Sequence, residues 1–288
     1  MAERTQTGSE AATGAIDEAV IEDILPVRRT LRRDRWLGLA SFATMLGIWF
    51  AITGGGLWPP LVQPAFLPSP VTVMKTFVKL ATSGYQGHSL AHHFGVSLMR
   101  FGIAFAVCVI VGVPVGLLMG MHSGIRAVLD PPIETTRPIP KLALLPLFII
   151  WFGIGELSKT IVIAAALFPL ISISAMQAVR AVSVRRIQAA LSLGASRATI
   201  FFRVLLPASL PGIFTGLRVS VGIGVTMLVG AEMVATSDGI AWMSLTAADF
   251  LQTDIVLVGV LIMAALGYAL DLVFRALERR VVHWAGRD

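Results

Sequence analysis

The sequence predicts an all-α protein whose helices cross a membrane several times. Its 288 residues are 56% hydrophobic and only 14% charged, and the mean hydropathy is +0.80. Soluble domains carry about 25% charged residues, so most of this chain is expected to face something other than water. Long apolar runs separated by short polar segments then indicate membrane helices.

A helix needs about 20 apolar residues to cross a bilayer. Six apolar runs come close enough to this length to be considered as spans. The third run is short and is interrupted by Pro146. It is kept because six spans, with both ends of the chain inside, place the large arginine clusters on one side of the membrane. The predicted spans are 36–53, 101–121, 140–154, 160–179, 212–231 and 255–274.

Positive charge gathers between these runs in the pattern typical of cytoplasmic segments. Clusters of Lys and Arg precede the first run and follow the second, the fourth and the sixth, which explains the net charge of +6. Residues 1–35 are expected to form a partly disordered cytoplasmic tail rather than a signal peptide, and 285–288 a short cytoplasmic tail. The basic residues need no nucleic acid to explain them, and anionic lipid headgroups suit them.

The segments on the other side carry less positive charge. Residues 232–254 hold four acidic residues and no Lys or Arg. Arg100 is expected to extend from the start of the second span to the membrane surface. Residues 66–82 predict an amphipathic helix with an apolar stripe, lying either at the outer interface or as a lid on the bundle. The stripe consists of Val71, Met74, Phe77, Val78 and Ala81.

Three glycines in the second predicted span share one helix face. Gly112, Gly116 and Gly120 recur at a spacing of four, which favours close approach of another helix, and Pro114 predicts a kink. Glycine is also common in membrane helices generally. The one cysteine, Cys108, lies in the same run and is interpreted as a packing residue.

The polar segment 180–211 predicts a helical hairpin. Residues 184–193 suit a helix, Gly194 permits a sharp turn, and Ser196 caps a second helix. Pro207 and Pro211 are expected to end that second helix. A hairpin with an exposed apolar patch is typical of a docking surface for a partner.

This hairpin resembles a cytoplasmic motif of the permeases of binding-protein-dependent ATP-binding-cassette (ABC) importers. The motif has the form EAA, three residues, Gly, nine residues, I-x-L-P. Here Gln188-Ala189-Ala190 is followed by Gly194 and then by Val204, Leu205, Leu206 and Pro207, at the same spacing. Gln188 replaces Glu and Val204 replaces Ile, so the charge of the motif's glutamate is absent.

The resemblance implies a type I importer permease bundle in which segment 184–207 is the coupling hairpin. It implies docking on an ABC ATPase dimer through Gln188, Ala189, Ala190 and Gly194, with Leu206 and Pro207 fixing the exit into the fifth span. No G-x-x-x-x-G-K-[ST] phosphate loop occurs in the chain. The implied ATP and Mg therefore belong to the partner, and no cofactor or catalytic residue is expected in this chain.

Further segments resemble the taurine, nitrate and sulfonate branch of these permeases, across residues 36–284. They include FLPSP at 66–70, the run 137–159 and LGASRA at 193–198, while 245–260 and 275–284 look most like taurine permeases. The resemblance implies a bacterial inner-membrane protein, a substrate-binding protein outside and a second permease copy. Taurine is the expected substrate, with an alkanesulfonate, nitrate or bicarbonate as alternatives.

Four residues are candidates for the substrate pathway. Glu232 ends the fifth span; it either pairs with a basic group, contacts a gate or is an ordinary interfacial carboxylate, because it would repel an anion directly. Thr226, Met227 and Trp242 either line the passage or pack in the core. Three histidines, His88, His92 and His93, are expected to be polar loop residues that face the binding protein rather than a metal site.

Two other classes remain as alternatives. A stand-alone secondary transporter would favour internal repeats and buried ionisable residues, and it would leave the hairpin unexplained. A membrane-embedded enzyme would need a reactive constellation, and the sequence shows no such set.

Overall fold

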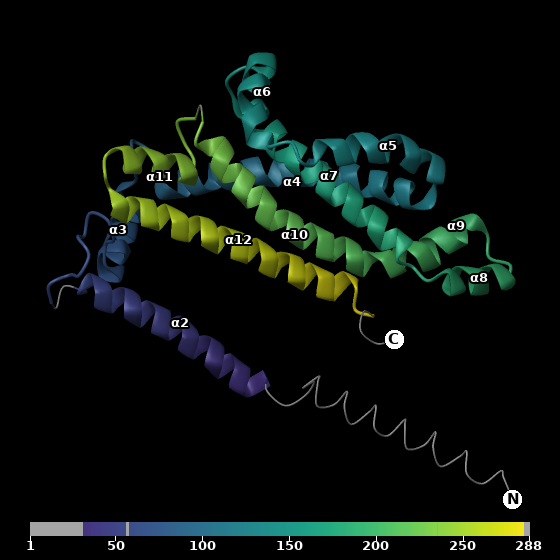
Figure 1. The fold of residues 1–288 in the computed structure, drawn as a ribbon, viewed down its shortest axis with the longest axis horizontal. Coiled ribbons are helices and arrows are strands. Elements are labelled where there is room, and N and C mark those ends of the chain that lie inside the picture. The colour runs from purple at the N-terminus through teal and green to yellow at the C-terminus, as the bar shows by residue number, and fades with distance from the viewer. Residues whose placement is uncertain (1–30, 56–57, 235, 285–288) are drawn as a thin grey trace, which may run out of the picture. The chain divides into compact units, whose positions relative to one another are not determined.

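The computed structural model describes residues 31–55, 58–234 and 236–284, with backbone only for 31–35. The predicted tails therefore lie almost wholly outside the described residues. The chain divides into two compact units, residues 1–62 and 63–288. The described residues form helices and loops, with a single isolated β-bridge between Tyr85 and His88 (Figure 1).

The first unit contains one long apolar helix, α2 (Leu31–Thr53). Its C-terminal turn is closed by Trp58, whose Nε1 donates to the carbonyl oxygen of Ala51 at 3.0 Å. The Trp58 ring also packs edge-on against Phe50. This helix matches the first predicted span.

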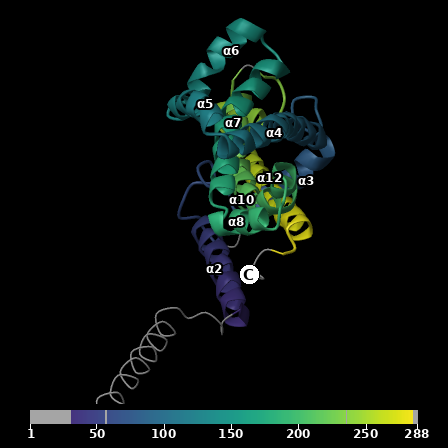
Figure 2. The same cartoon turned by 90° about the vertical axis from the view of Figure 1, so that its right-hand side faces the viewer.

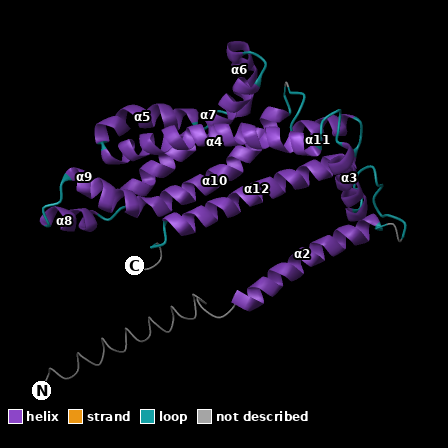
Figure 3. Cartoon of the chain, turned by 180° about the vertical axis from the view of Figure 1, so that it is seen from behind, coloured by secondary structure: helices purple, strands orange, loops and turns teal. Residues whose placement is uncertain are grey.

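Four long helices form the frame of the second unit: α4 (Leu90–Met121), α7 (Glu156–Arg180), α10 (Leu206–Glu232) and α12 (Thr253–Val281). Helix α7 packs against both α4 and α10, and α10 also packs against α12. Short helices α8 (Val184–Ser192) and α9 (Arg197–Ile200) lie at one end, here called the hairpin end. Helix α11 (Ile240–Asp249) lies at the opposite end, and Figure 3 shows the same arrangement from behind.

The prediction of six full-length spans is not exact. Within the described residues, five helices are long and apolar enough to cross a membrane. The third predicted span, 140–154, contains only a 3-10 turn η1 (Lys141–Leu144) followed by α6 (Leu145–Phe152). Pro140 and Pro146 at its start and Gly153 at its end restrict this segment to 12 residues, 141–152, about 18 Å of helix.

The segment before it is also helical, and it folds back along the bundle. Helix α5 (Ser123–Thr136) packs on α4 and α7. Its Ile133 joins a buried cluster with Met119, Ile173 and Met176. This apolar contact holds α5 along the bundle, and the chain around Arg137 forms the turn between α5 and η1.

The close helix contact predicted from the glycines of the second span is confirmed. A Cβ on Gly116 would overlap the carbonyl oxygen of Ser172 in α7 and lie 2.7 Å from the Cβ of Ala175. A Cβ on Gly120 would lie 2.7 Å from that of Val179. The backbones of α4 and α7 therefore approach along this face, with Pro114 inside the continuous helix α4.

The predicted amphipathic segment is α3 (Pro70–Ser83), capped by the Ser69 hydroxyl. It packs on α12 through the face that contains Val73, Thr76 and Leu80, and Thr76 Oγ1 donates to Asp254 Oδ2 at 2.6 Å. The predicted apolar stripe, Val71, Met74, Phe77, Val78 and Ala81, is exposed on the other face. An exposed apolar stripe suits the interface of a membrane.

Candidate functional site

The hairpin end carries the segment that the sequence singled out. Helix α8 has no buried residue; Gln188 and Ala189 are exposed and Ala190 is half-buried. The surface around them combines exposed apolar side chains, with Leu193 88% exposed, and the exposed Arg185 and Arg186. Figure 2 looks at the bundle from this end, with α8 in front. An exposed helix with such a patch is suited to docking a partner.

The turn after α8 depends on Gly194. Its φ is +77°, a conformation that other residues adopt only with strain. The turn is closed by two hydrogen bonds, from Gly194 N to Leu191 O at 2.9 Å and from Ala195 N to Ala190 O at 3.1 Å. Ser196 then caps α9, accepting from Thr199 N at 3.2 Å.

The second half of the hairpin does not end where the prolines predicted. A π-helical turn, η2 (Phe201–Leu205), joins α9 to α10, so the chain stays helical from Arg197 to Glu232. Pro207 falls in the first turn of α10, where its missing N–H is tolerated. Leu206 and Pro207 are half-buried at this junction.

The opposite end holds a buried ion cluster centred on Arg100, here called the Arg100 cluster. The guanidinium is fully buried, and it donates to three carboxylates from three parts of the chain. Nε lies 2.5 Å from Glu156 Oε2, Nη1 lies 3.0 Å from Glu232 Oε1, and Nη2 lies 2.6 Å from Asp238 Oδ1. The cluster therefore joins α4, α7, α10 and the loop after α10.

Glu232 is one of the predicted pathway residues, and it is fully buried. Besides Arg100, its carboxylate accepts from Ser97 Oγ at 2.7 Å and from Ala241 N at 3.0 Å. Of the alternatives weighed from the sequence, pairing with a basic group is the one that the structure contains. In this conformation Glu232 has no exposed surface to offer a substrate.

His93 extends the same network. Its Nδ1 accepts from Gly239 N at 3.2 Å, so Nε2 carries the proton that it shares with the carbonyl oxygen of Tyr85 at 3.3 Å. Trp242, another predicted pathway residue, stacks on the His93 ring with centroids 5.6 Å apart. His93 and Trp242 thus hold the loop before α11 in place.

Asp238 lies on that loop, outside the long helices. Burial raises the pKa of its carboxyl, but the hydrogen bond and charge of Arg100 outweigh burial, so the pKa lies below its usual value. His92 approaches the same carboxylate at 3.5 Å. His92 and His88 stack on each other, and no group of three potential metal ligands gathers within the described ranges.

Thr226 and Met227 lie on α10, one to two turns before the Arg100 cluster. Thr226 is exposed and its hydroxyl donates to the carbonyl oxygen of Gly222 at 3.0 Å, while Met227 is half-buried. A Cβ on Gly222 would meet open space. This stretch of α10 is therefore open in the single chain, and neither residue touches Glu232 or Trp242 through a bond described here.

A second ion cluster, missed from the sequence, links α10 to α12. Arg218 Nε lies 3.0 Å from Asp271 Oδ1 and Nη1 lies 3.5 Å from Glu278 Oε2. Arg275 Nε lies 2.6 Å from the other oxygen of Asp271. Because α10 is also tied to α4 and α7 by Arg100, both of its halves are held by ion pairs.

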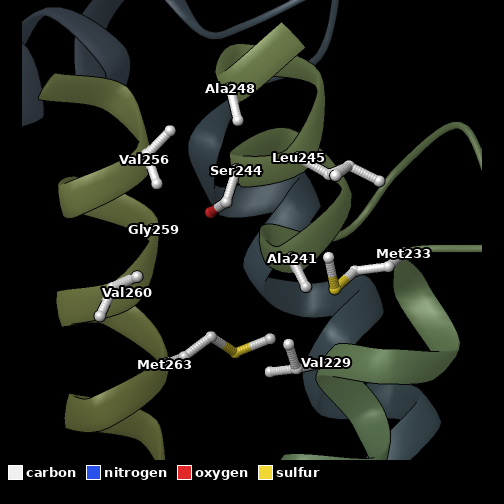
Figure 4. A pocket seen from close by; sticks show the side chains of 10 residues that line it. All are labelled: Val229, Met233, Ala241, Ser244, Leu245, Ala248, Val256, Gly259, Val260 and Met263. Carbon is white, nitrogen blue, oxygen red and sulfur yellow. The ribbon is translucent and has the colours of Figure 1, made fainter. Parts of the chain in front are cut away.

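An apolar cavity of about 330 Å³ lies between α10, α11 and α12 (Figure 4). Its walls are aliphatic and include Val229, Val260 and Met263. The hydroxyl of Ser244 is the polar group among its lining side chains, and it already donates to Ile240 O at 2.9 Å. The cavity therefore offers no charge or free donor to an anion.

Comparison with known proteins identifies relatives along almost the whole chain. The model of the family described as "Binding-protein-dependent transport system inner membrane component" matches residues 112–283. The taurine transport system permease protein TauC of Escherichia coli K12 is 40% identical over 272 residues, which are 94% of this chain and 98% of that protein. A putative aliphatic sulfonates transport permease, SsuC of Bacillus subtilis 168, is 35% identical over 88% of this chain and 89% of its own length.

Solved structures share the fold at lower identity. A chain of the MetNI methionine ABC transporter in an inward-facing conformation superposes with a TM-score of 0.53 at 19% identity, covering 65% of this chain and 95% of that one. A chain of an amino acid ABC transporter superposes with a TM-score of 0.51 at 21% identity, covering 73% and 96%. These likenesses show that the helical fold of this chain is shared with chains of ABC transporters.

Proposed function

The chain belongs to the family of binding-protein-dependent transport system inner membrane components, and we propose that it is the permease of an ABC importer for taurine. In this role it provides the passage, and the energy comes from ATP bound with Mg by a separate ATPase dimer. The observation that carries the ATPase assignment is the exposed α8 helix with its Gly194 turn. It is an apolar, small-residue surface at the end of a rigid bundle, presented to a partner.

The proposed orientation of the bundle in the membrane follows from the position of the hairpin. If α8 docks on a cytoplasmic ATPase, the hairpin end is inside and the Arg100 cluster is at the outer end. The arginines of α8 and α9 at the hairpin end agree with this direction under the positive-inside rule. A substrate-binding protein then docks near α3, α11 and the loop at Asp238, and a second copy of the chain completes the passage in the bacterial inner membrane.

The substrate assignment is supported by similarity over full length. The relative named for taurine transport is 40% identical across 98% of its own length, and one named for aliphatic sulfonates is 35% identical across 89%. Both names concern small organic sulfonates. An aliphatic sulfonate is therefore the alternative substrate that a specific finding favours, ahead of nitrate or bicarbonate.

The geometry supports transport by rigid-body motion of the bundle. Helix α7 leads from the Arg100 cluster straight to the hairpin and packs closely on α4 through Gly116. When ATP draws the two ATPases together, a force on α8 is transmitted along α7 and α10 without a flexible segment between them. The passage then alternates between openings at its two ends.

Co-purification tests the docking surface directly. The tagged chain is expressed with its ATPase and extracted in mild detergent, and the retained ATPase is measured. The Ala190→Arg variant is expected to retain little ATPase, because the substitution places a charge in the docking surface. Ala91→Arg, an equally drastic change on the exposed face of α4 at the other end, is the matched control; equal retention by both variants would refute docking through α8.

A further inference from the structure

A second cavity, of about 380 Å³, lies where helix α5 ends and η1 begins. Its lining includes Thr136, Ile139 and Lys141 from this break, and Phe148 from α6. Phe168 and Pro169 of α7 also line it. The size lies in the range of cavities that hold small organic molecules, and apolar walls with a few polar groups are typical of such sites.

The cavity lies halfway between the two ends of the bundle. Its α7 residues, Ala165 to Pro169, are the tenth to fourteenth of the 25 residues of that helix. They are therefore about 13 to 20 Å from the start of α7, at a rise of 1.5 Å per residue. Helix α7 is long and apolar enough to cross a membrane, and with α7 as a span the break between α5 and η1 lies near the middle of the membrane.

Charged side chains at this depth are exposed. Glu134 and Arg137 pair at 2.9 Å, and each is 48% exposed. Lys141 is half-buried beside them. Charges at the centre of a membrane are too costly to face lipid, and they face protein or a water-filled passage instead. The broken segment therefore borders the aqueous passage of the assembled transporter.

The Lys141 ammonium has a donor to spare for a ligand. It donates to the carbonyl oxygens of Thr136 and Ile139, which leaves one of its three N–H groups free. Glu134 is engaged by Arg137. Across the residues that the structure covers, no carboxylate lies within ion-pair distance of Lys141, so an uncompensated positive charge is part of the lining of an apolar cavity.

We propose that this cavity holds the substrate midway through transfer, with a sulfonate group at Lys141 and the aliphatic part against Phe148 and Phe168. The inference rests on the proposed import of a small sulfonate, and it names the site in the permease. A discontinuous helix at mid-membrane is also the usual setting of substrate sites in other transporters. The apolar cavity between α10 and α12 has no comparable charge.

Thiol labelling tests the site without relying on transport. Thr136→Cys places a thiol on the cavity wall. The one native cysteine, Cys108, is buried, so labelling of the unmodified chain gives the background. The complex with its ATPase is treated with sulfonatoethyl methanethiosulfonate, an anion, or with the trimethylammonium analogue, a cation. The thiol is expected to react, and millimolar taurine or methanesulfonate is expected to slow the reaction.

The charge of Lys141 is tested by the pair Thr136→Cys and Thr136→Cys/Lys141→Gln. Removing a unit charge within a few ångströms of the thiol is expected to lower the anion-to-cation rate ratio by about tenfold. A thiol that does not react, or a ratio unchanged by the second substitution, overturns the proposal. Labelling of this kind is independent of whether taurine is the substrate.

Uptake by the reconstituted transporter provides the second readout. Lys141→Gln is expected to lower the maximal rate several-fold while the half-saturating substrate concentration, set by the binding protein, stays constant. Lys141→Arg keeps the charge and is expected to restore much of the rate, and Arg279→Gln, at an exposed position near the end of α12, is the control. Full uptake by Lys141→Gln refutes the site, whereas no uptake by the unmodified complex refutes the proposed function instead.

Discussion

Arg100 and Glu232 form an ion pair without any exposed surface on either side chain: Nη1 lies 3.0 Å from Oε1. The two residues are 132 positions apart, on α4 and α10. Removing two charges from water costs about as much as their attraction returns, so such a pair need not stabilise the fold by itself. The pair instead favours the one packing of α4 and α10 that brings the two side chains together, because either residue alone would be an unpaired buried charge.

Arg100→Met is accordingly expected to destabilise the protein by about 3–5 kcal/mol, since it leaves the buried Glu232 carboxylate without a counter-charge. Thermal unfolding of the detergent-solubilised protein measures the loss. Arg137→Met breaks an exposed pair and is expected to cost no more than about 1 kcal/mol. Adding Glu232→Gln to Arg100→Met should recover part of the stability, and equal losses for both arginine variants would contradict the role assigned to burial.

The approach of α4 to α7 gives a second prediction. Gly116→Ala is expected to destabilise the fold by about 1–3 kcal/mol, because the new methyl group overlaps the Ser172 carbonyl oxygen. Gly102→Ala on the same helix meets nothing within 4 Å. It is expected to gain up to about 1 kcal/mol from the higher helix propensity of alanine. Unfolding temperatures of the two variants check the contact, and a neutral Gly116→Ala would show that the helices are further apart.

Gly194 is expected to matter for coupling. Gly194→Val forces a β-branched residue into a φ of +77°, at a cost of about 1–2 kcal/mol, and it is expected to reorient α8 and reduce uptake per ATP hydrolysed while the protein still inserts. Gly87 is a matched control, because its φ is +83° and a Cβ there also meets open space.

Gly87→Val should therefore show similar strain with unchanged ATPase co-purification and basal hydrolysis. The ratio of substrate imported to ATP hydrolysed, in proteoliposomes, separates the two variants. Full coupling in Gly194→Val would exclude the hairpin as the transmitting element.

Asp238 predicts a pH dependence. Because the pKa of its carboxyl is lower in the folded protein than in the unfolded chain, its ionised form stabilises the fold above the unfolded pKa. That contribution is lost as the pH falls below about 4, through the folded pKa.

Unfolding temperatures between pH 3 and 6 are expected to fall less steeply with acid in Asp238→Asn than in the unmodified protein. The substitution also removes a partner of Arg100, so the slopes are compared rather than the absolute values. Asp249→Asn, at an exposed position on α11, should keep the original slope. Identical slopes for all three proteins would argue against a role for the Asp238 charge.

The sequence predicted the elements whose signals are local. Apolar runs located the long helices, and Gly194 with Ser196 located the turn of the hairpin, because a positive φ and a helix cap each depend on one residue and its neighbours. The glycine spacing predicted a close helix contact on one face of α4 for the same reason, and the structure identifies the partner as α7. Periodicity within one helix reveals a face, and small residues on it permit close approach.

The Arg100 cluster could not be predicted in this way, and the expectation that Arg100 reaches the membrane surface was wrong. Its partners Glu156, Glu232 and Asp238 are 56, 132 and 138 residues away, and no local pattern pairs them. The available signal was a lone arginine inside an apolar helix, which is costly unless it is paired. The pairing itself depends on the packing of three helices.

The return of α5 along the bundle was missed because Pro131 and Pro132 are typical of a loop. In the structure they lie inside α5, where the apolar contact of Ile133 with Met119 and Ile173 outweighs their poor helix propensity. Similarly, Pro207 and Pro211 were expected to end a helix. The π-helical turn at Phe201–Leu205 lets the helix continue through them.

The central claim is that this chain is the permease of an ATP-driven importer for taurine, and the most direct measurement is uptake of labelled taurine into proteoliposomes. These would contain this chain, its co-expressed ATPase and its binding protein, with ATP enclosed on the ATPase side. ATP-dependent uptake is expected, with taurine outcompeting methanesulfonate and nitrate. Uptake of an aliphatic sulfonate or nitrate in preference to taurine would contradict the substrate, and uptake without ATP or without the ATPase would contradict the importer assignment itself.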